Sequence, residues 1–352
     1  MIAALVRATG NAALFAGACG LGCLAIGLVL PLPDVPQAKE KLEWFRAHRD
    51  EYTALFLGSS RVRRHIIPSL FDRLAAEQGI EMHSFNLGMD SLAAPEDAYV
   101  LDQALAAAPP RLRYVFIELT YFRANFAGQG ADTIRSAYWH DWERTCAVWR
   151  RLASEEWQQI KPPKKRKKQR WSGWLADVGE CLDLFATHGR LFLQRATNLG
   201  RGAGCLQKLT GLRPPGDPLA PLGPARDGFI PSDTVMNAAS LSEYQRQLSS
   251  LKTTESRTKP LDRVPQENLE AMLARVRAHG AEPVLFIAPT PGGAVLYPRR
   301  EVAPLLDFSD PLRWPSLFDP QYRADVTHLN TAGAEVFTRA LFSAAKLSAQ
   351  QR

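Results

Sequence analysis

A long uncharged stretch near the N-terminus restricts this chain more than any other feature of its sequence. It covers residues 12–32, which as an α-helix would extend about 31 Å at about 1.5 Å per residue, close to the roughly 30 Å hydrocarbon core of a bilayer. Pro31 and Pro33 end it, and Arg7 before it favours an N-terminus on the inside. The sequence therefore predicts one transmembrane helix, with the rest of the chain outside.

A cleaved signal peptide is the competing interpretation of this segment. Its apolar region would be shorter, about 7–15 residues, and small residues would precede the cleavage site. Residues 27–33 read Gly-Leu-Val-Leu-Pro-Leu-Pro, without small residues at those positions. We therefore expect residues 1–33 to form an uncleaved single-pass anchor in the cell inner membrane, followed by an extracytoplasmic, periplasmic domain.

The positive charge of the chain is concentrated in one short run. The sequence has 43 basic and 36 acidic residues, a net charge of +7, and seven of the cations lie between Lys161 and Arg170 without an acid among them. A nucleic-acid binder would spread its cations over a face or a groove, so no nucleic-acid partner is expected. The run is either a solvated loop or a contact for anionic lipid headgroups or an anionic polymer, an attraction screened within about 8 Å at physiological salt.

Short apolar runs alternate with helical segments on both sides of a different, central region. Such alternation indicates an α/β fold with a parallel sheet covered on both faces. The expected strands cover residues 52–57, 82–85, 113–119 and 283–288. The expected helices cover residues 68–78, 95–107, 266–279 and 331–347.

The central region, residues 128–263, interrupts this alternation and reads as an insertion between two core segments, 34–127 and 264–352. It holds six of the eight tryptophans together with the basic run. We expect helices near residues 141–159 and 176–193 and a loop-like chain afterwards. The tryptophans either form the core of the insertion or offer flat apolar faces on which sugar rings stack.

Two turns that follow expected strands carry candidate functional groups. Leu57-Gly58-Ser59-Ser60 would present a serine hydroxyl at the carboxyl edge of the sheet, where such folds build their sites. Asn86-Leu87-Gly88 would bring the Gly88 N–H near a bound oxygen as an oxyanion donor. Either turn, taken alone, is equally well explained as ordinary turn chemistry.

A third candidate lies near the C-terminus, in the segment Asp325-Val-Thr-His328-Leu-Asn-Thr-Ala-Gly333. Asp325 and His328 can share one loop, with the carboxylate holding one imidazole nitrogen and the other free to take a proton from a serine. The alternative is a helix-capping aspartate beside a surface histidine. A metal site fits less well, because no second histidine or cysteine lies at ligand spacing; we expect neither a metal nor another cofactor.

Taken together and in this order, the segments resemble the SGNH/GDSL hydrolase superfamily over residues 53–126 and 266–347. The resemblance implies a flavodoxin-like three-layer α/β/α fold and a Ser-His-Asp triad. Ser60 would be the nucleophile, His328 the base and Asp325 its orienting acid. The backbone N–H groups of Ser60 and Gly88 would line the oxyanion hole, and Ser59 takes the place of the family's usual aspartate.

The chain departs from that family after the third strand, where an asparagine normally supplies another oxyanion donor. The corresponding stretch, residues 118–125, reads Glu-Leu-Thr-Tyr-Phe-Arg-Ala-Asn, and Tyr121 or Asn125 could substitute. Loss of one such donor typically costs about 3–4 kcal/mol of transition-state stabilisation. In this respect the chain resembles a membrane-anchored subgroup that includes alginate O-acetyltransferase accessory proteins and the D-alanyl transfer protein of the teichoic-acid pathway.

This resemblance implies a serine acyltransferase or esterase that acts on O-acyl groups, foremost O-acetyl, of a cell-envelope polysaccharide. Its partners would be the envelope carbohydrate as substrate, a membrane-bound O-acyltransferase, and the membrane itself through residues 12–32. The competing interpretations are a non-catalytic assembly or binding subunit that retains the fold, and a soluble cytosolic lipase.

Several other residues have no expected catalytic role. Arg61, Arg63 and Arg64 either solvate a helix face or hold an anionic substrate near Ser60, and Glu118 either faces the site or is exposed. Two of the cysteines Cys146, Cys181 and Cys205 could pair in an exported domain. Surface or packing roles are expected for His65, His83, His140, His188 and His279.

Overall fold

The computed structural model divides the chain into two compact units. The anchor unit combines Met1–Val35 with Ala124–Asp217, and the sheet unit combines Pro36–Arg123 with Pro218–Arg352. The residues that the structure describes are 2–126, 130–131, 133–160, 170–211, 219–251 and 257–347.

Within the described residues, the sheet unit contains one parallel sheet of five strands in the order β2-β1-β3-β5-β7. The strands are β1 (Ala54–Leu57), β2 (Ser84–Asn86), β3 (Tyr114–Glu118), β5 (Glu282–Ile287) and β7 (Leu305–Asp307). The expected α/β fold with a parallel sheet is therefore confirmed.

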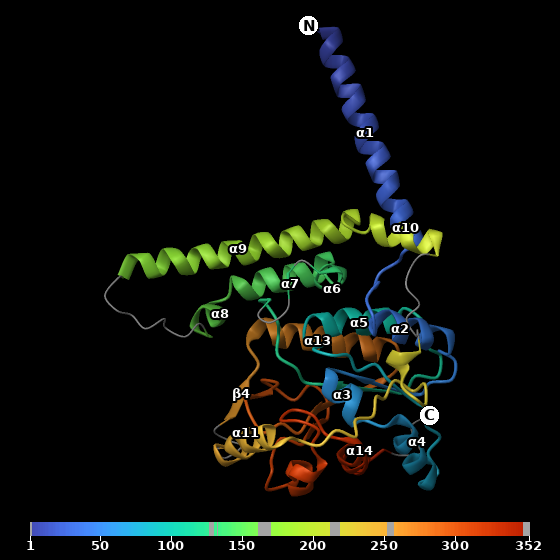
Figure 1. Cartoon of the computed structure of the whole chain (residues 1–352), viewed down its shortest axis with the longest axis vertical. Coiled ribbons are helices and arrows are strands. Elements are labelled where there is room, and N and C mark those ends of the chain that lie inside the picture. Colours follow the sequence, from blue (N-terminus) through green and yellow to red (C-terminus); the bar gives the residue numbers. More distant parts are fainter. Residues whose placement is uncertain are drawn as a thin grey trace. The chain divides into compact units, whose positions relative to one another are not determined.

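Helices cover both faces of this sheet (Figure 1). Helix α5 packs against α2 and α13 on one face, and α14 packs against α3 and α4 on the other. Because both faces are covered, β1 to β3 are buried throughout and carry aromatic residues such as Phe56 and Phe116 into the core. The helices are α2 (Ala38–Ala47), α3 (Ser60–His65), α4 (Pro68–Glu77), α5 (Glu96–Leu105), α11 (Ala238–Ser249), α13 (Arg263–Ala278) and α14 (Thr331–Ala345).

Three short strands and helix α11 of the sheet unit are among the elements that the sequence did not predict. Strand β7 and the pair β4 (Thr258–Pro260) and β6 (Val295–Tyr297) have three residues each, too few to show an alternating pattern. Helix α11 lies in the stretch expected to be loop-like, where Asn237 caps it by accepting a hydrogen bond from the Ser240 N–H.

The anchor unit contains α1 (Ile2–Val29), which is long and apolar enough to span a membrane and leaves its described side chains largely exposed. Helix α9 packs against α6 and α7 of the same unit. The other helices of the unit are α6 (Ile134–Tyr138), α7 (Trp142–Leu152), α8 (Glu155–Ile160), α9 (Arg170–Thr197) and α10 (Gly202–Thr210).

The expected insertion 128–263 is divided between the two units. Its last part belongs to the sheet unit, because the Asp227 carbonyl accepts a hydrogen bond from the Asn86 N–H at 2.8 Å and the Ile230 N–H donates to the Arg63 carbonyl at 3.0 Å. Most of the basic run, residues 161–169, lies outside the described residues. The five cysteines are free thiols, so no pair among Cys146, Cys181 and Cys205 is bridged.

The tryptophans of the anchor unit differ in burial. Trp139 and Trp157 are buried, as core residues are, whereas the Trp142 side chain is 62% exposed. The side chains of Trp171 and Trp174 lie outside the described part of the chain.

Candidate active site

The turn between β1 and α3 places Ser60 at the start of a helix. A Cβ atom at Gly58 would lie 2.4 Å from a Val62 methyl group and 2.6 Å from Glu118 Cβ, so only glycine fits at this position. Ser59 caps the helix, since its Oγ accepts a hydrogen bond from the Arg61 N–H at 3.2 Å. Ser60 therefore stands at the carboxyl edge of the sheet with its N–H in the first turn of α3, where no intrahelical acceptor exists.

Three side chains from opposite ends of the sequence form a chain of hydrogen bonds at this edge. Ser60 Oγ lies 2.8 Å from His328 Nε2, although 268 positions separate the two residues. His328 Nδ1 lies 2.8 Å from Asp325 Oδ2. An ionised carboxylate only accepts hydrogen bonds, so Nδ1 carries the proton and Nε2 is free to accept the proton of the Ser60 hydroxyl. The structure thus brings together all three side chains that the sequence singled out for the triad.

Asp325 is the charged member of this arrangement. Partial burial opposes its ionisation, but hydrogen bonds from the His328 ring and from the Thr327 N–H outweigh burial and hold the pKa of the Asp325 carboxyl below its usual range. Its Oδ1 accepts from the backbone N–H groups of Thr327 at 2.8 Å and His328 at 2.9 Å. One carboxylate therefore both shapes the loop and orients the ring.

His65 holds the loop of His328 from the other side. Its Nε2 accepts a hydrogen bond from the Leu329 N–H at 2.9 Å, and the side chain is fully buried. Burial, reinforced by the charge of nearby His328, lowers the pKa of His65 well below its ordinary value. His65 and Ser60 lie on the same short helix, so α3 positions both the hydroxyl and the backbone next to His328. The sequence predicted a packing or surface histidine here and missed this bond.

Glu118, at the end of β3, holds the turn that carries Ser60. Its carboxylate is buried, accepts the Ser59 N–H at 2.6 Å through Oε2, and pairs through Oε1 with Arg61 Nε at 2.6 Å. Of the two alternatives considered for Glu118, exposure is therefore wrong, and the side chain acts on the turn before Ser60. A buried carboxylate is tolerated only with such partners.

The second predicted oxyanion donor is not available in this structure. The Gly88 N–H donates to Asn86 Oδ1 at 2.8 Å, while Asn86 Nδ2 donates to the carbonyls of Val62 at 2.7 Å and Ile66 at 2.9 Å. A Cβ at Gly88 would lie 2.2 Å from Arg63 N. Glycine is thus needed at position 88 for close packing against α3, and the interpretation of Asn86-Leu87-Gly88 as a structural turn fits better than the donor role.

A buried lysine that the sequence did not single out supports this second turn. Lys41 Nζ donates to the carbonyls of Asn86 at 2.9 Å, Gly88 at 2.7 Å and Gly228 at 2.7 Å. Burial lowers the pKa of Lys41 well below its ordinary value, and the charge of Arg63 lowers it further. The sequence offers no signal for this role, because residues 36–49 indicate only a polar helix or linker.

Two of the three arginines that follow Ser60 form ion pairs within the sheet unit. Arg61 pairs with Glu118, as described above, and Arg63 Nη1 pairs with Asp90 Oδ2 at 2.6 Å. These pairs fix Arg61 and Arg63 more firmly than a purely solvated face would, and a contact with an anionic substrate stays a prediction. Of the two proposed substitute donors, Tyr121 is 56% exposed and its hydroxyl accepts from Arg123 at 3.1 Å, whereas Asn125 belongs to the anchor unit.

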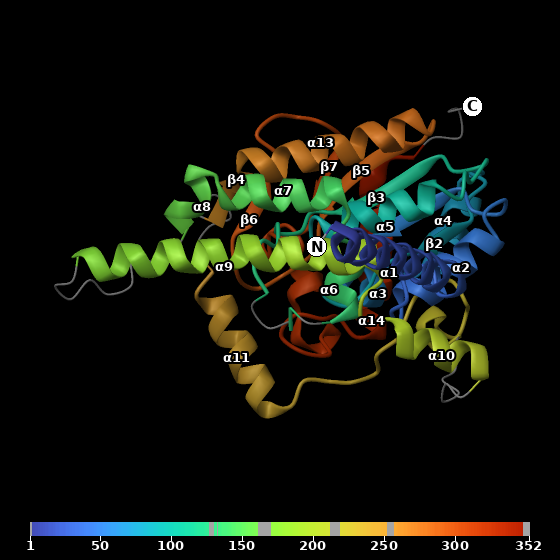
Figure 2. The ribbon, with the colours of Figure 1, turned by 90° about the horizontal axis from the view of Figure 1, so that it is seen from above.

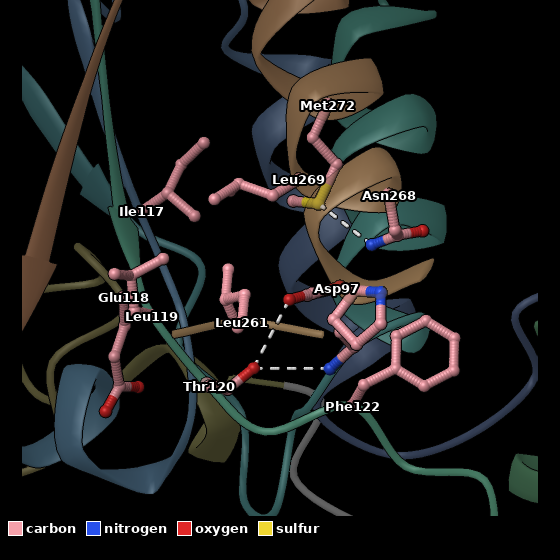
Figure 3. A pocket seen from close by; sticks show the side chains of 12 residues that line it. Asp97, Ile117, Glu118, Leu119, Thr120, Phe122, Leu261, Asn268, Leu269 and Met272 are labelled. Atoms are coloured by element: carbon pink, nitrogen blue, oxygen red, sulfur yellow. Dashed lines mark hydrogen bonds between the residues drawn. The ribbon is translucent and has the colours of Figure 1, made fainter. Parts of the chain in front are cut away.

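A small cavity lies between the end of β3 and helices α5 and α13 (Figure 3). Thr120 lines this cavity. Its Oγ1 donates to Asp97 Oδ2 at 3.4 Å and accepts from the Ala94 N–H at 3.2 Å. Its volume of about 20 Å³ is enough for roughly one water molecule. Neither Ser60 nor His328 lines it, so it is not the place for an acyl or sugar substrate.

No model of a known protein family matches the chain, and no curated protein matches it with significant similarity. Among the described residues there is no group of three or more His, Cys, Asp or Glu side chains that could hold a metal ion. The chemistry of this site is accordingly argued from Ser60, His328, Asp325 and their surroundings.

Proposed function

We propose that this protein is a membrane-anchored serine acyltransferase or esterase of the SGNH type, with Ser60, His328 and Asp325 as its triad. The observation that carries the proposal is the 2.8 Å contact between Ser60 Oγ and His328 Nε2, continued to Asp325 at 2.8 Å. The parallel sheet with helices on both faces supports a flavodoxin-like three-layer fold, and the order of Ser60 and the Asp-x-x-His segment supports the family resemblance.

The proposed reaction proceeds in two halves. Ser60 Oγ attacks the carbonyl carbon of an ester while His328 Nε2 takes the hydroxyl proton; the leaving alcohol then takes that proton and departs, and the acyl group stays on Ser60. Next, a water molecule or a sugar hydroxyl attacks the acyl carbonyl and gives its proton to His328, which returns it to Ser60 Oγ. The products of this second half are a free acid or a new ester, and regenerated Ser60.

Each supporting group has a defined part in this mechanism. Asp325 keeps the proton on Nδ1 of His328 and stabilises the imidazolium that forms after proton transfer. The Ser60 N–H, at the positive end of α3, is the donor available to the developing oxyanion. With the Gly88 N–H bound to Asn86, the site is poorer in such donors than a general esterase.

The substrate proposal is an O-acyl group, foremost acetyl, of a cell-envelope polysaccharide. It rests on the resemblance to the membrane-anchored subgroup and on α1, which is long and apolar enough to hold the chain at a membrane. The proposed location is the cell inner membrane with the sheet unit in the periplasm. A membrane-bound O-acyltransferase is the proposed partner, since such an enzyme would provide acyl groups at the same surface.

A non-catalytic assembly or binding subunit is the second candidate. The observation in its favour is the scarcity of oxyanion donors. The Gly88 N–H is bound to Asn86, and residues 118–125 lack the asparagine that the family has after its third strand. Such a subunit would keep the fold without turning over a substrate.

Labelling with a fluorophosphonate, which reacts with activated serine hydroxyls, separates the two candidates. We expect the wild-type chain to be labelled and Ser60→Ala not to be. The neighbouring variant Ser59→Ala is the matched control: it removes the helix cap, at a cost of about 1 kcal/mol in stability, but keeps the Ser60 hydroxyl and should still be labelled. Folded wild-type protein that takes up no label would favour the non-catalytic subunit.

Transfer and hydrolysis are then distinguished by the products. Purified protein is given an acetyl ester with and without an oligosaccharide acceptor. Acetylated sugar supports transfer, and free acetate alone supports hydrolysis. Both products should disappear in Ser60→Ala.

A further inference from the structure

Exposed leucines gather on two helices of the anchor unit besides α1. On α9, the side chains of Leu182 and Leu193 are 64% and 58% exposed; Leu199, between α9 and α10, is 62% exposed; and Leu206 and Leu209 on α10 are 62% and 67% exposed. Contiguous exposed apolar surface of this kind marks a contact with another protein or with a membrane.

Leu182 and Leu193 of α9 lie on an exposed face of the helix. Leu182, Ala186 and Leu193 follow helical spacing and share one exposed face. Leu191 lies on the opposite side of the helix and is fully buried. That buried side meets α7, where Trp149 Nε1 donates to the Phe185 carbonyl at 3.1 Å. Leu182, Ala186 and Leu193 are called the apolar stripe of α9 here, and exposed Asp183 and Arg190 flank it.

Polar side chains bind the junction between α9 and α10 to the last turns of α1. Asn198 Nδ2 donates to the Cys23 carbonyl at 2.8 Å, and Lys208 Nζ donates to the Val29 carbonyl at 2.6 Å. Arg201 donates to the carbonyl of Leu30. A spanning helix reaches the boundary of the hydrocarbon core near its end, so these bonds place the junction at the depth where α1 leaves the bilayer.

The arrangement of the helices turns the stripe toward the same side as α1. Figures 1 and 2 show α9 and α10 running across the axis of α1 at its C-terminal end, and Figure 1 shows α7 on the side of α9 away from α1. The face of α9 opposite α7 is thus on the side from which α1 extends. Leu28, in the last turn of α1, is 84% exposed.

We propose that α9 and α10 are interfacial helices that lie in the surface of the lipid bilayer, with Leu182, Leu193, Leu206 and Leu209 in its apolar boundary. This inference rests on the proposed membrane-spanning role of α1. A helix that lies in the interface buries its apolar face at the boundary between headgroups and acyl chains. The bilayer fits as the occupant because the leucines lie on helices that are bonded to the end of α1, whose own apolar side chains are also exposed.

Depth-dependent quenching tests the proposal on the full chain in phosphatidylcholine nanodiscs. Single cysteines carrying the fluorophore NBD are introduced at Leu182, Leu193, Leu206 and Leu209 in a chain whose five native cysteines are replaced by alanine, with folding checked by circular dichroism. Lipids brominated near the headgroup should quench most of the emission at these positions. The controls are Leu14→Cys in α1, expected to be quenched by lipids brominated deeper in the chain, and Glu143→Cys on α7, expected to be unquenched.

Each result separates this inference from the anchor on which it rests. Quenching at Leu14 without quenching at the four leucines overturns the interfacial placement and leaves the anchor intact. A blue-shifted but unquenched signal at the leucines also overturns it, because a second copy of the chain or another protein would then cover the stripe. Absence of quenching at Leu14 overturns the anchor and this inference together, whatever fluorophosphonate labelling of Ser60 shows.

Discussion

Around Ser60 the sheet unit buries charged and polar side chains, whereas α9 and α10 of the anchor unit leave leucines exposed. Lys41, His65 and Glu118 are each almost completely buried and bind backbone groups of the turns that surround the site. Leu182 and Leu209 have no such cover. Buried polar groups are held by hydrogen bonds, and in the placement proposed above the exposed leucines of α9 and α10 meet lipid. Around Ser60 polar groups are thus covered, whereas on α9 and α10 apolar groups are not.

The largest effect should follow from removing the charge of the partly buried Asp325 carboxylate, which is bonded to His328. Asp325→Asn keeps the shape of the side chain but removes the carboxylate that holds the proton on His328 Nδ1. By analogy with the same change in a serine protease, the acylation rate should fall about 10⁴-fold. Fluorophosphonate labelling rates of the wild type and the variant measure it. A loss of less than tenfold would mean that His328 is not oriented by Asp325.

The next effect concerns the buried ion pair beneath the Ser60 turn. Glu118→Ala leaves Arg61 and the Ser59 N–H without their acceptor, and breaking a buried pair in this way costs about 3–5 kcal/mol of stability. Urea unfolding in detergent measures this loss. The matched control is Glu81→Ala, which breaks the exposed pair with Arg111 and should cost no more than about 1 kcal/mol. Equal costs at both positions would contradict the role given to Glu118.

The third prediction compares the contributions to stability of two leucines on opposite sides of α9. Leu191→Ala removes a fully buried side chain and should lower the free energy of unfolding by about 2–5 kcal/mol. Leu182→Ala, on the exposed stripe, should change it by no more than about 0.5 kcal/mol in detergent. Unfolding curves of the two variants give the comparison directly. Similar losses would show that the stripe is packed against protein.

The smallest effect is a pH dependence that comes from His65. Because its pKa is lowered in the folded state, the unfolded chain binds more protons below the ordinary histidine pKa of about 6.5. The contribution of His65 is therefore fully present above that pH and decreases as the pH falls, by about 1.4 kcal/mol per pH unit. His65→Gln, which can keep an acceptor for the Leu329 N–H, should flatten this slope in unfolding measurements between pH 7 and about 5. Identical slopes would refute the assignment.

Local patterns in the sequence were sufficient for most of the sheet unit. The runs that predicted β1, β2, β3 and β5 are apolar and end at turn residues, and the segment after Asn330 predicted α14. Strand β7 was missed because three residues carry no period, and only its pairing with β5 makes it a strand. The structure also divides the chain at other points than the expected insertion, since residues after 218 join the sheet unit through long-range backbone bonds that local patterns do not encode.

The sequence was sufficient to predict the three reactive side chains of the candidate site, but not the hydrogen bonds that hold the surrounding turns in place. Ser60, His328 and Asp325 were recognisable because serine, histidine and aspartate stand in turns and loops near strand ends, which parallel strands bring to one edge. The occupation of the Gly88 N–H by Asn86 was not predictable, nor were the bonds of Lys41 and His65. Those depend on which backbone group lies within about 3 Å, which no spacing in the sequence encodes.

By itself, the sequence determined the uncharged helix, the strands of the parallel sheet and the three side chains proposed for the triad, because each depends on a local pattern or on residue type. The tertiary structure alone decided which polar groups were buried and bonded, and which leucines were left without a covering element. The physical reason is that burial and hydrogen bonding belong to pairs of groups far apart in the chain, and only folding brings such pairs together.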